Sequence, residues 1–325
     1  MGLEERAPGP QRTRWKRADL HVHTCFSGWR SAGLLDAQDC YVRPEAAFAA
    51  ARARGMDFVC FTDHDTIDGA LDFLSRHPEH EPSVIVGEEI EARFPGSKTW
   101  IHIGVLDVDD ALHDDLSRLR TDCFELIGEL ARRGRWFVLN HPFQSFRTVA
   151  EAERRLREVL PLFPAVEVSN ATSPRSHAAI LEAWLGRSAR PDTVRVGGSD
   201  AHTRGGIGAV CTAAPARSKA EFLDALRGGR CVIEGRPRGF PALVRDVYAI
   251  IGQYYARLYG GRRPLTARRL KSLAAGTALL PASLLGAPLA LTALQFARQE
   301  WIARRGPWAA SGRIARRSAS PLLEN

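Results

Sequence analysis

A chain of 325 residues, 45% of them apolar, has room for one large α/β domain with an appendage or for two domains, and this composition excludes a disordered protein. The six cysteines show no Cys-x-x-Cys spacing, which favours reduced thiols over a disulfide framework or a thiolate metal site. The net charge of +8 is uneven, because residues 236–325 carry +12 and residues 1–235 carry −4. A basic tail is typical of proteins that bind anionic lipid or nucleic acid, and a merely Arg-rich composition is the alternative.

Apolar runs and helical patterns alternate along the chain after a polar start. Residues 1–17 hold no apolar core of the kind a secretory signal needs, so we expect a disordered lead-in. Strands are predicted at 20–23, 57–62, 83–90, 99–106, 136–140, 165–169, 193–197 and 231–234, and helices at 44–54, 67–76, 111–133, 149–160, 176–185 and 219–227. Strands that alternate with helices indicate a parallel sheet, and this many units favour closure into a barrel.

Two histidines open the series of polar motifs. His21 and His23 stand two residues apart in a predicted strand, so both imidazoles face the same side. Imidazole nitrogen is a common ligand of zinc, iron and manganese. Taken alone, the pair fits a core or surface position as well as it fits a metal site.

Further polar residues stand at or just after successive predicted strands. They are Thr62-Asp63-His64-Asp65, Gly87-Glu88-Glu89, Asn140-His141-Pro142, Glu167-Val168-Ser169-Asn170 and Gly198-Ser199-Asp200-Ala201-His202, with His102 inside its strand. Active sites of α/β barrels are built at the carboxyl ends of the strands. Six histidines beside Asp and Glu at such places favour metal binding over structural roles. The remaining histidines, His77, His80, His113 and His177, are expected to be solvated.

The motifs DLHVHT, TDHDT, GEE, HIG, NHP and GSDAH, in this order, resemble those of the polymerase and histidinol phosphatase (PHP) family of phosphoesterases. The resemblance covers about residues 18–235. It implies a distorted seven-stranded (β/α) TIM-like barrel. The remaining residues, 236–325, are expected from their own pattern to form a C-terminal helical appendage. The resemblance also implies two or three divalent ions, which are usually Mn, Fe or Zn.

The resemblance further implies a set of ligands. One ion would be held by His21, His23, Glu89 and Asp200, a second by Glu89, His102 and His141, and a third by His64 and His202. Glu89 is preferred to Glu88 because the family pattern is Gly-any-Glu. The catalytic candidates are Asp63, His64 and Asp65; the two aspartates would support the ligands or face the substrate, with a structural role in a turn as the alternative.

One loop departs from the family pattern. Members usually supply an Asp or His five or six residues after the second histidine, where this chain has Gly28 and Trp29. Either Asp36 or Asp39 takes over, or the third ion is weak or missing. We expect two ions and a loosely held third.

The ligands indicate the chemistry. Clustered divalent ions lower the pKa of a shared water and neutralise phosphoryl oxygens, so we expect hydrolysis of a phosphoester by a metal-bound hydroxide. The chain has no Walker-type phosphate loop. The resemblance allows a phosphomonoester, a nucleotide or a nucleic-acid end as substrate, and Arg204, Asn170 and Arg30 are candidates to bind it.

One alternative function is that of a non-catalytic metal-barrel module that its basic tail recruits to a membrane or nucleic acid. Another is an amidohydrolase-type C–N hydrolase, but such enzymes usually need a ligating lysine, which the motifs lack.

The tail raises a separate question of membrane contact. Residues 243–259 predict an amphipathic helix, and residues 272–297 carry no charge over a length that could span a bilayer. Prolines interrupt this segment, and Lys and Arg flank it evenly, so the positive-inside rule favours neither side. We expect a broken, membrane-dipping helix pair hinged near Gly286 and Pro288, both ends cytoplasmic, on a cytoplasmic protein that is peripheral or monotopic at the inner face of the membrane. Residues 243–317 would make the contact, with aromatic anchors at Tyr255, Tyr259, Trp301 and Trp308. A soluble appendage packed on the barrel or on a partner chain is the alternative.

Overall fold

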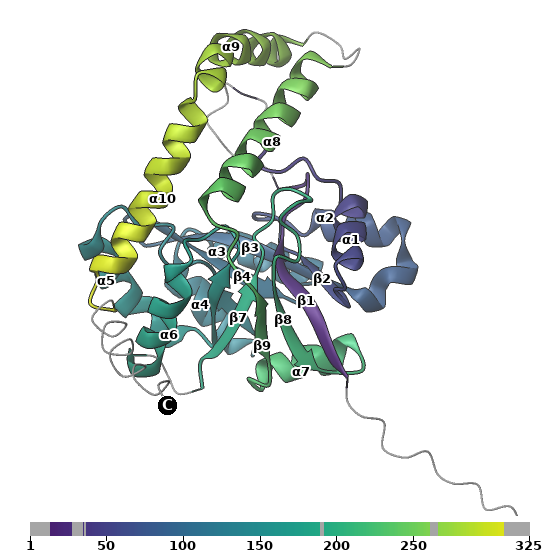
Figure 1. The fold of residues 1–325 in the computed structure, drawn as a ribbon. Coiled ribbons are helices and arrows are strands. Elements are labelled where there is room, and N and C mark those ends of the chain that lie inside the picture. The colour runs from purple at the N-terminus through teal and green to yellow at the C-terminus, as the bar shows by residue number, and fades with distance from the viewer. Residues whose placement is uncertain (1–13, 28–34, 36, 189–191, 261–265, 309–325) are drawn as a thin grey trace, which may run out of the picture.

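A sheet wrapped by helices carries an arch of three C-terminal helices in the computed structural model, which describes residues 14–27, 35, 37–188, 192–260 and 266–308 (Figure 1). The strands are β1 (Trp15–Val22), β2 (Phe58–Phe61), β3 (Val84–Arg93), β4 (Trp100–Leu106), β5 (Phe137–Leu139), β6 (Ala165–Asn170), β7 (Val194–Gly198), β8 (Val210–Pro215) and β9 (Val232–Gly235). The helices around the sheet are α1 (Pro44–Ala53), α2 (Asp68–Arg76), α3 (Asp110–Leu119), α4 (Cys123–Arg132), α5 (Val149–Val159), α6 (Ser176–Ser188) and α7 (Lys219–Arg227). The arch consists of α8 (Phe240–Tyr259), α9 (Ala267–Leu284) and α10 (Ala287–Arg305).

The nine described strands form one sheet in the order β7-β6-β5-β4-β3-β2-β1-β8-β9. Its two ends approach each other, because the Thr212 hydroxyl on β8 accepts from Gly197 N of β7 at 2.9 Å and donates to Gly197 O at 2.8 Å. The sheet is therefore nearly closed, which confirms the predicted barrel-like α/β fold with a C-terminal helical appendage.

The strand pairing differs from the all-parallel prediction, and the described strands number nine rather than seven. β3 and β4 are antiparallel, as are β4 and β5, β1 and β8, and β8 and β9. Only six residues join β3 to β4, and Gly96 in that turn has φ +64°. A connection this short reverses the chain but leaves no room for a crossover helix. β8 was not predicted, because its sequence VCTAAP contains two alanines and few strong strand formers.

The predicted single helix at 111–133 is wrong, since the chain forms two helices there. The Asp109 side chain accepts from Leu112 N at 2.8 Å and caps α3, and the Asp122 side chain accepts from Phe124 N at 2.9 Å and caps α4. An aspartate at the N-cap satisfies backbone donors that have no partner in the helix, so Asp122 begins a new helix.

Burial on both faces of the central strands explains their apolar sequences. All four residues of β2 are buried, and Phe58 packs 5.0 Å from the ring of Phe222 on α7 while Phe61 packs 5.8 Å from Phe73 on α2. A strand covered on both sides reads as a continuous apolar run. The polar side chains that could bind a ligand or react therefore lie at the strand ends.

The arch is anchored to the body at both ends. At the start of α8, Arg238 pairs with Asp246, whose carboxylate accepts from the Thr203 hydroxyl at 3.0 Å. At the other end, Trp308 is fully buried, 5.1 Å from the rings of Phe143 and Trp184. Trp308 therefore belongs to the core, and its predicted role as a membrane anchor is wrong.

A bend separates α9 from α10 at the predicted hinge. Gly286 has φ +96°, in the left-handed region that favours glycine, and α10 begins directly after it. No single helix in the described chain is long and apolar enough to cross a membrane, whereas residues 269–284 and 287–305 meet that test only as a pair bent by 71°.

The remaining boundaries agree with the prediction only in part. β1 begins at Trp15, so it overlaps the lead-in predicted for residues 1–17, whose first 13 residues lie outside the described part.

All six cysteines are free thiols, as their spacing predicted.

Candidate metal centre

β1 and the residue after it deliver two imidazoles to one point. The Nε2 atoms of His21 and His23 lie 3.1 Å apart, and both side chains are almost completely buried. Asp200, which follows β7, places Oδ1 at 3.6 Å from His21 Nε2 and 3.4 Å from His23 Nε2. The alternation of side chains along a strand thus brings the HxH pair to the edge of the sheet as predicted.

Glu89 on β3 lies at the centre of the cluster. Its Oε1 atom is 3.2 Å from His21 Nε2, 2.9 Å from His141 Nε2 and 3.3 Å from His102 Nδ1. Its Oε2 atom is 3.4 Å from His23 Nε2 and 3.2 Å from His64 Nδ1. One buried carboxylate therefore faces five imidazoles, which suits a bridge between two cations.

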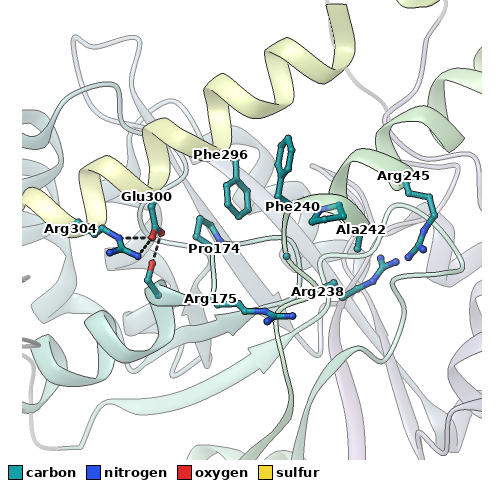
Figure 2. A pocket seen from close by; sticks show the side chains of 12 residues that line it. Pro174, Arg175, Arg238, Phe240, Ala242, Arg245, Phe296, Glu300 and Arg304 are labelled. Atoms are coloured by element: carbon teal, nitrogen blue, oxygen red, sulfur yellow. Dashed lines mark hydrogen bonds and ion pairs between the residues drawn. The ribbon is translucent and has the colours of Figure 1, made fainter. Parts of the chain in front are cut away.

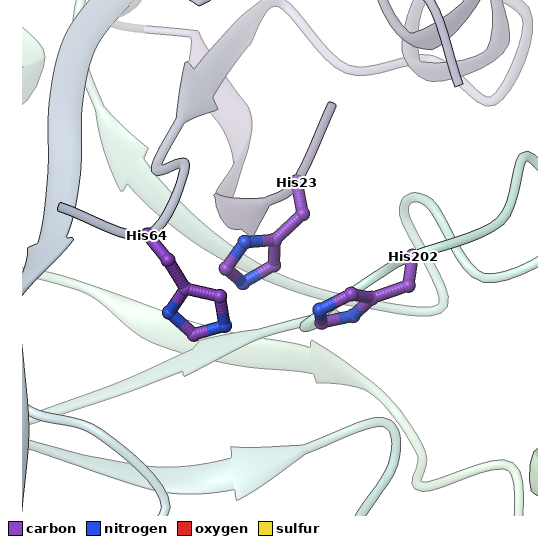
Figure 3. Close-up of side chains that lie close together, drawn as sticks. All are labelled: His23, His64 and His202. Atoms are coloured by element: carbon purple, nitrogen blue, oxygen red, sulfur yellow. The ribbon is translucent and has the colours of Figure 1, made fainter. Parts of the chain in front are cut away.

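Three groups of these side chains bring their donor atoms close enough to hold an ion. They are His21, Glu89, His141 and Asp200; His64, Glu89 and His102; and His23, His64 and His202. Figure 3 shows the last group, whose imidazoles converge from three separate segments. The structure brings together all eight side chains named as ligands, and His23 lies near His21 and Asp200 as well as in the group of His64 and His202. Their role as ligands stays a prediction.

Asp39 belongs to the loop that departs from the family pattern, and its side chain lies beside His64 and His202. Its Oδ2 atom lies 3.4 Å from His64 Nε2 and 3.6 Å from His202 Nε2, and Ser27 donates to it at 3.3 Å. Its buried Oδ1 atom has no hydrogen-bond partner in the described structure. The other residues of that argument, Gly28, Trp29 and Asp36, lie outside the described residues.

Two supporting residues were given no role from the sequence. Glu167 places Oε1 at 3.0 Å from His21 Nδ1 and accepts from His141 N at 3.0 Å through Oε2. Ser27 lies 3.1 Å from His23 Nδ1. Partners at Nδ1 fix the ring and leave Nε2 directed at the cluster, as is usual for metal-binding histidines. The sequence feature that could have indicated Glu167 is an acidic residue inside the otherwise apolar, buried strand AVEVSN.

The electrostatics of the cluster call for cations. Burial alone would raise the pKa of Glu89 and of Asp200, but the surrounding histidines hold both well below the usual range. Burial lowers the pKa of His23, and hydrogen bonds with Asp200 and Glu89 outweigh it and raise the pKa to about 10. The two buried carboxylates therefore need nearby positive charge, which protonated imidazoles or a bound cation can provide.

Orphaned polar atoms and the type of donors show that the residues fit metal ions. Glu89 Oε2 and His141 Nδ1 are buried without a hydrogen-bond partner in the described structure. Imidazole with carboxylate is a donor set that suits zinc, iron and manganese. The backbone is also strained here, since His141 has φ +24° and Asp200 has φ +51°. Strain of this kind persists where the surrounding structure fixes a functional geometry.

Asp63 and Asp65, two of the catalytic candidates, direct their hydrogen bonds away from the cluster. Asp63 is buried and accepts from the Thr24 hydroxyl at 2.7 Å, and burial raises its pKa to about 6. Asp65 pairs with Arg120 at 2.6 Å and accepts from Glu91 N at 3.1 Å. These contacts hold the loops that carry His23 and His64, and a catalytic role for the two aspartates stays a prediction.

The substrate-binding candidates occupy different positions. Asn170 is buried and donates to Glu167 Oε2 at 2.9 Å, so its amide supports the cluster. Arg204 is exposed and lines a cavity of about 480 Å³ that none of the eight predicted ligands line. Arg30 lies outside the described residues.

A larger cavity of about 750 Å³ lies where the arch meets the loop after β6 (Figure 2). Arg175, Arg238 and Arg245 line it together with Phe240 and Phe296. None of the predicted metal ligands contributes to its wall, so the sequence motifs gave no signal for it.

The four other histidines are not uniformly solvated. His177 is buried, and burial lowers its pKa to about 4, so the prediction is wrong for this residue. Its side chain packs 5.1 Å from the ring of Phe143, because α6 turns it toward the core. His113 is half-buried, with Nδ1 at 2.9 Å from Glu88 Oε2, whereas His77 and His80 are partly exposed.

Comparisons with known proteins bear on the same residues. The PHP domain model matches residues 19–125 and a PHP-associated model matches residues 193–231. An uncharacterized protein of Methanocaldococcus jannaschii is 34% identical over 74 residues, which are 23% of this chain and 43% of the relative, so the match spans less than half of that protein.

Two solved structures are similar at a lower level. A two-domain protein from Bacteroides vulgatus, described as containing a predicted PHP-like metal-dependent phosphoesterase, is 17% identical with a TM-score of 0.47 over 77% of this chain and 75% of its own. PsfC from Pseudomonas syringae is 19% identical with a TM-score of 0.47 over 75% of this chain and 99% of its own. Similarity at this level fixes neither substrate nor reaction. The two matched domain models, however, confirm the resemblance drawn from the motifs over residues 19–125 and 193–231.

Proposed function

We propose that the protein hydrolyses a phosphoester with divalent metal ions held by the His, Glu and Asp cluster. The observation that carries this proposal is Glu89, a fully buried carboxylate with five imidazoles within 3.4 Å of its two oxygens. Divalent ions bound there would lower the pKa of water and neutralise phosphoryl oxygens as the leaving group departs.

The protein's own residues orient this chemistry. Thr172 donates to Asp200 Oδ2 at 3.0 Å, while Oδ1 of the same carboxylate faces His21 and His23. Glu167 holds the ring of His21 from the opposite side. Because Glu167 is buried and Thr172 partly buried, the ligands keep one geometry, which is the main requirement for a site that acts by electrostatic stabilisation.

We also infer a complete third ion site in place of the weak one expected from the sequence. Asp39 reaches His64 and His202 from the loop in which the family pattern is lost, and its Oδ1 atom has no other partner in the described structure. A carboxylate at this point supplies the negative charge that two neutral imidazoles lack. The metals proposed are Mn, Fe or Zn, in keeping with the donor set.

The proposed substrates are a phosphomonoester, a nucleotide or a nucleic-acid end. A panel of nucleotides, sugar phosphates and short oligonucleotides, assayed with Mn²⁺, tests the proposal. We expect Mn²⁺-dependent hydrolysis of at least one class, and a fall of more than about 100-fold for Glu89→Gln, because this change removes a carboxylate that two of the donor groups share.

Glu88→Gln is the matched control, since Glu88 is the next residue along β3 and lies against His113 instead of the cluster. Its activity should stay close to that of the wild type. If metal-loaded protein cleaves no phosphoester of the panel, the non-catalytic metal-barrel module becomes the better account.

A further inference from the structure

The junction of α9 and α10 exposes a group of leucines. We call this junction, residues 279–294, the elbow. The exposed fractions are 76% for Leu284, 86% for Leu285, 67% for Leu291 and 68% for Leu294. Single exposed leucines are ordinary, but a contiguous apolar group at the tip of a projecting element marks an interaction surface.

The arch that carries the elbow is a fixed structure. The Tyr255 hydroxyl donates to Gly276 O at 3.2 Å, and the Tyr259 hydroxyl lies 2.9 Å from Thr277 Oγ1. A Cβ at Gly276 would lie 2.5 Å from Leu258 Cδ2, so the lack of a side chain lets α8 and α9 pack closely. Because α10 is also buried in the body through Ile302, the elbow projects from the body in a defined direction (Figure 1), and its leucines are exposed there.

The charge around the elbow has one sign. Residues 247–299 contain no Asp or Glu and seven Lys or Arg, and Lys271 near the start of α9 is exposed. The acidic residues at either limit of this stretch lie at the base of the arch, where Asp246 pairs with Arg238 and Glu300 pairs with Arg304. An exposed apolar tip with basic flanks is complementary to a partner surface that carries negative charge on the outside and is apolar below it.

We propose that the elbow docks on a membrane that contains anionic lipids, with its leucines at the boundary between headgroups and acyl chains. The bend of 71° and the return of α10 to the body favour lying in the interface over crossing the bilayer. The start of α8 touches Thr203, next to His202, so docking would turn the metal-binding edge of the sheet toward the lipid surface. The proposal does not depend on the proposed reaction.

Vesicle sedimentation of the full chain tests the proposal. We expect binding to mixed phosphatidylcholine–phosphatidylglycerol vesicles, weaker binding to pure phosphatidylcholine vesicles, and release by salt. The double variant Leu284→Ser, Leu285→Ser should bind more than about tenfold more weakly, because two side chains lose apolar burial. Lys271→Gln should cost about fivefold, the effect of one basic residue near an anionic surface.

Leu162→Ser is the matched control, since Leu162 is 41% exposed but lies outside the arch, and it should bind like the wild type. Circular dichroism would check that each variant folds. Absence of wild-type binding to anionic vesicles would overturn the proposal, as would equal, salt-insensitive binding to both vesicle types. A wild-type dimer that the double leucine change converts to a monomer, without vesicle binding, would assign the elbow to contact between two copies instead.

Discussion

At the scale of single residues, Glu88 and Glu89 show that two neighbouring side chains of one strand lie in different surroundings. Successive side chains of a strand point to opposite faces, so Glu89 enters the cluster while Glu88 lies 2.9 Å from His113. Burial raises the pKa of Glu88, whereas the histidines around Glu89 hold its pKa well below the usual range. The choice of Glu89 rested on the Gly-any-Glu pattern, and its position agrees with that choice.

Other residues of the site could not be predicted because their roles depend on contacts far away in the sequence. Glu167 acts on His21 across 146 positions, and no local pattern indicates that pairing. Asp39 was one of two candidates in its loop, and only the fold places it beside His64 and His202. The motifs thus predict which types of residue form the site, whereas only the fold shows which side chains lie close enough to interact.

Asp39 leads to a prediction about metal content. Asp39→Ala should lower the bound divalent metal by about one ion per chain, because the His64 and His202 site loses a carboxylate that lies near both rings. Inductively coupled plasma mass spectrometry on protein purified without added metal would measure the loss. Asp36→Ala, which changes the other candidate of the same loop, serves as the control and should retain the wild-type content. An equal content in Asp39→Ala and the wild type would show that Asp39 is not a ligand.

At the scale of elements, the sequence predicted where strands and helices lie better than how they pair. Strands such as β2 and β6 were placed to within a residue or two, because both faces of each are buried and the apolar run is continuous. The antiparallel course of β4 was missed, because pairing direction follows from the length of a connection and not from strand composition. The break between α3 and α4 was missed because the apolar pattern continues across Asp122.

The approach of β7 to β1 yields a prediction at this scale. A Cβ at Gly198 would lie 2.5 Å from His21 Cβ and 2.8 Å from Glu167 Oε1. Gly198→Ala should therefore push β1 away from β7, reduce the free energy of unfolding by roughly 1–3 kcal/mol and weaken metal binding. Urea denaturation in the presence of a chelator would measure the first effect separately from the second.

Gly128→Ala is the contrasting change, since no heavy atom lies within 4 Å of a Cβ at that position in α4. There alanine should raise the free energy of unfolding by roughly 0.5–1 kcal/mol, because it lowers the backbone entropy lost in the helix. A Gly198→Ala protein as stable as the wild type would contradict the close contact between these strands.

At the scale of the whole molecule, the candidate metal centre depends on the nearly closed sheet. His21 and Asp200 come from opposite ends of the PHP-matched chain, and they meet because Val22 and Ala201 form a parallel bridge. Ions that bind only this arrangement stabilise the folded state by mass action. The arch begins beside this site, because Asp246 of α8 accepts from Thr203, the residue after His202.

The measurement that tests the central claim most directly is the metal content of three purified proteins: wild type, Glu89→Gln and Glu88→Gln. The account predicts more than one divalent ion per chain in the wild type and in Glu88→Gln, and a large loss in Glu89→Gln, because Glu89 belongs to two of the three donor groups and Glu88 to none of them. Wild-type protein that binds no divalent metal, or a Glu89→Gln variant that keeps its full content, would contradict it.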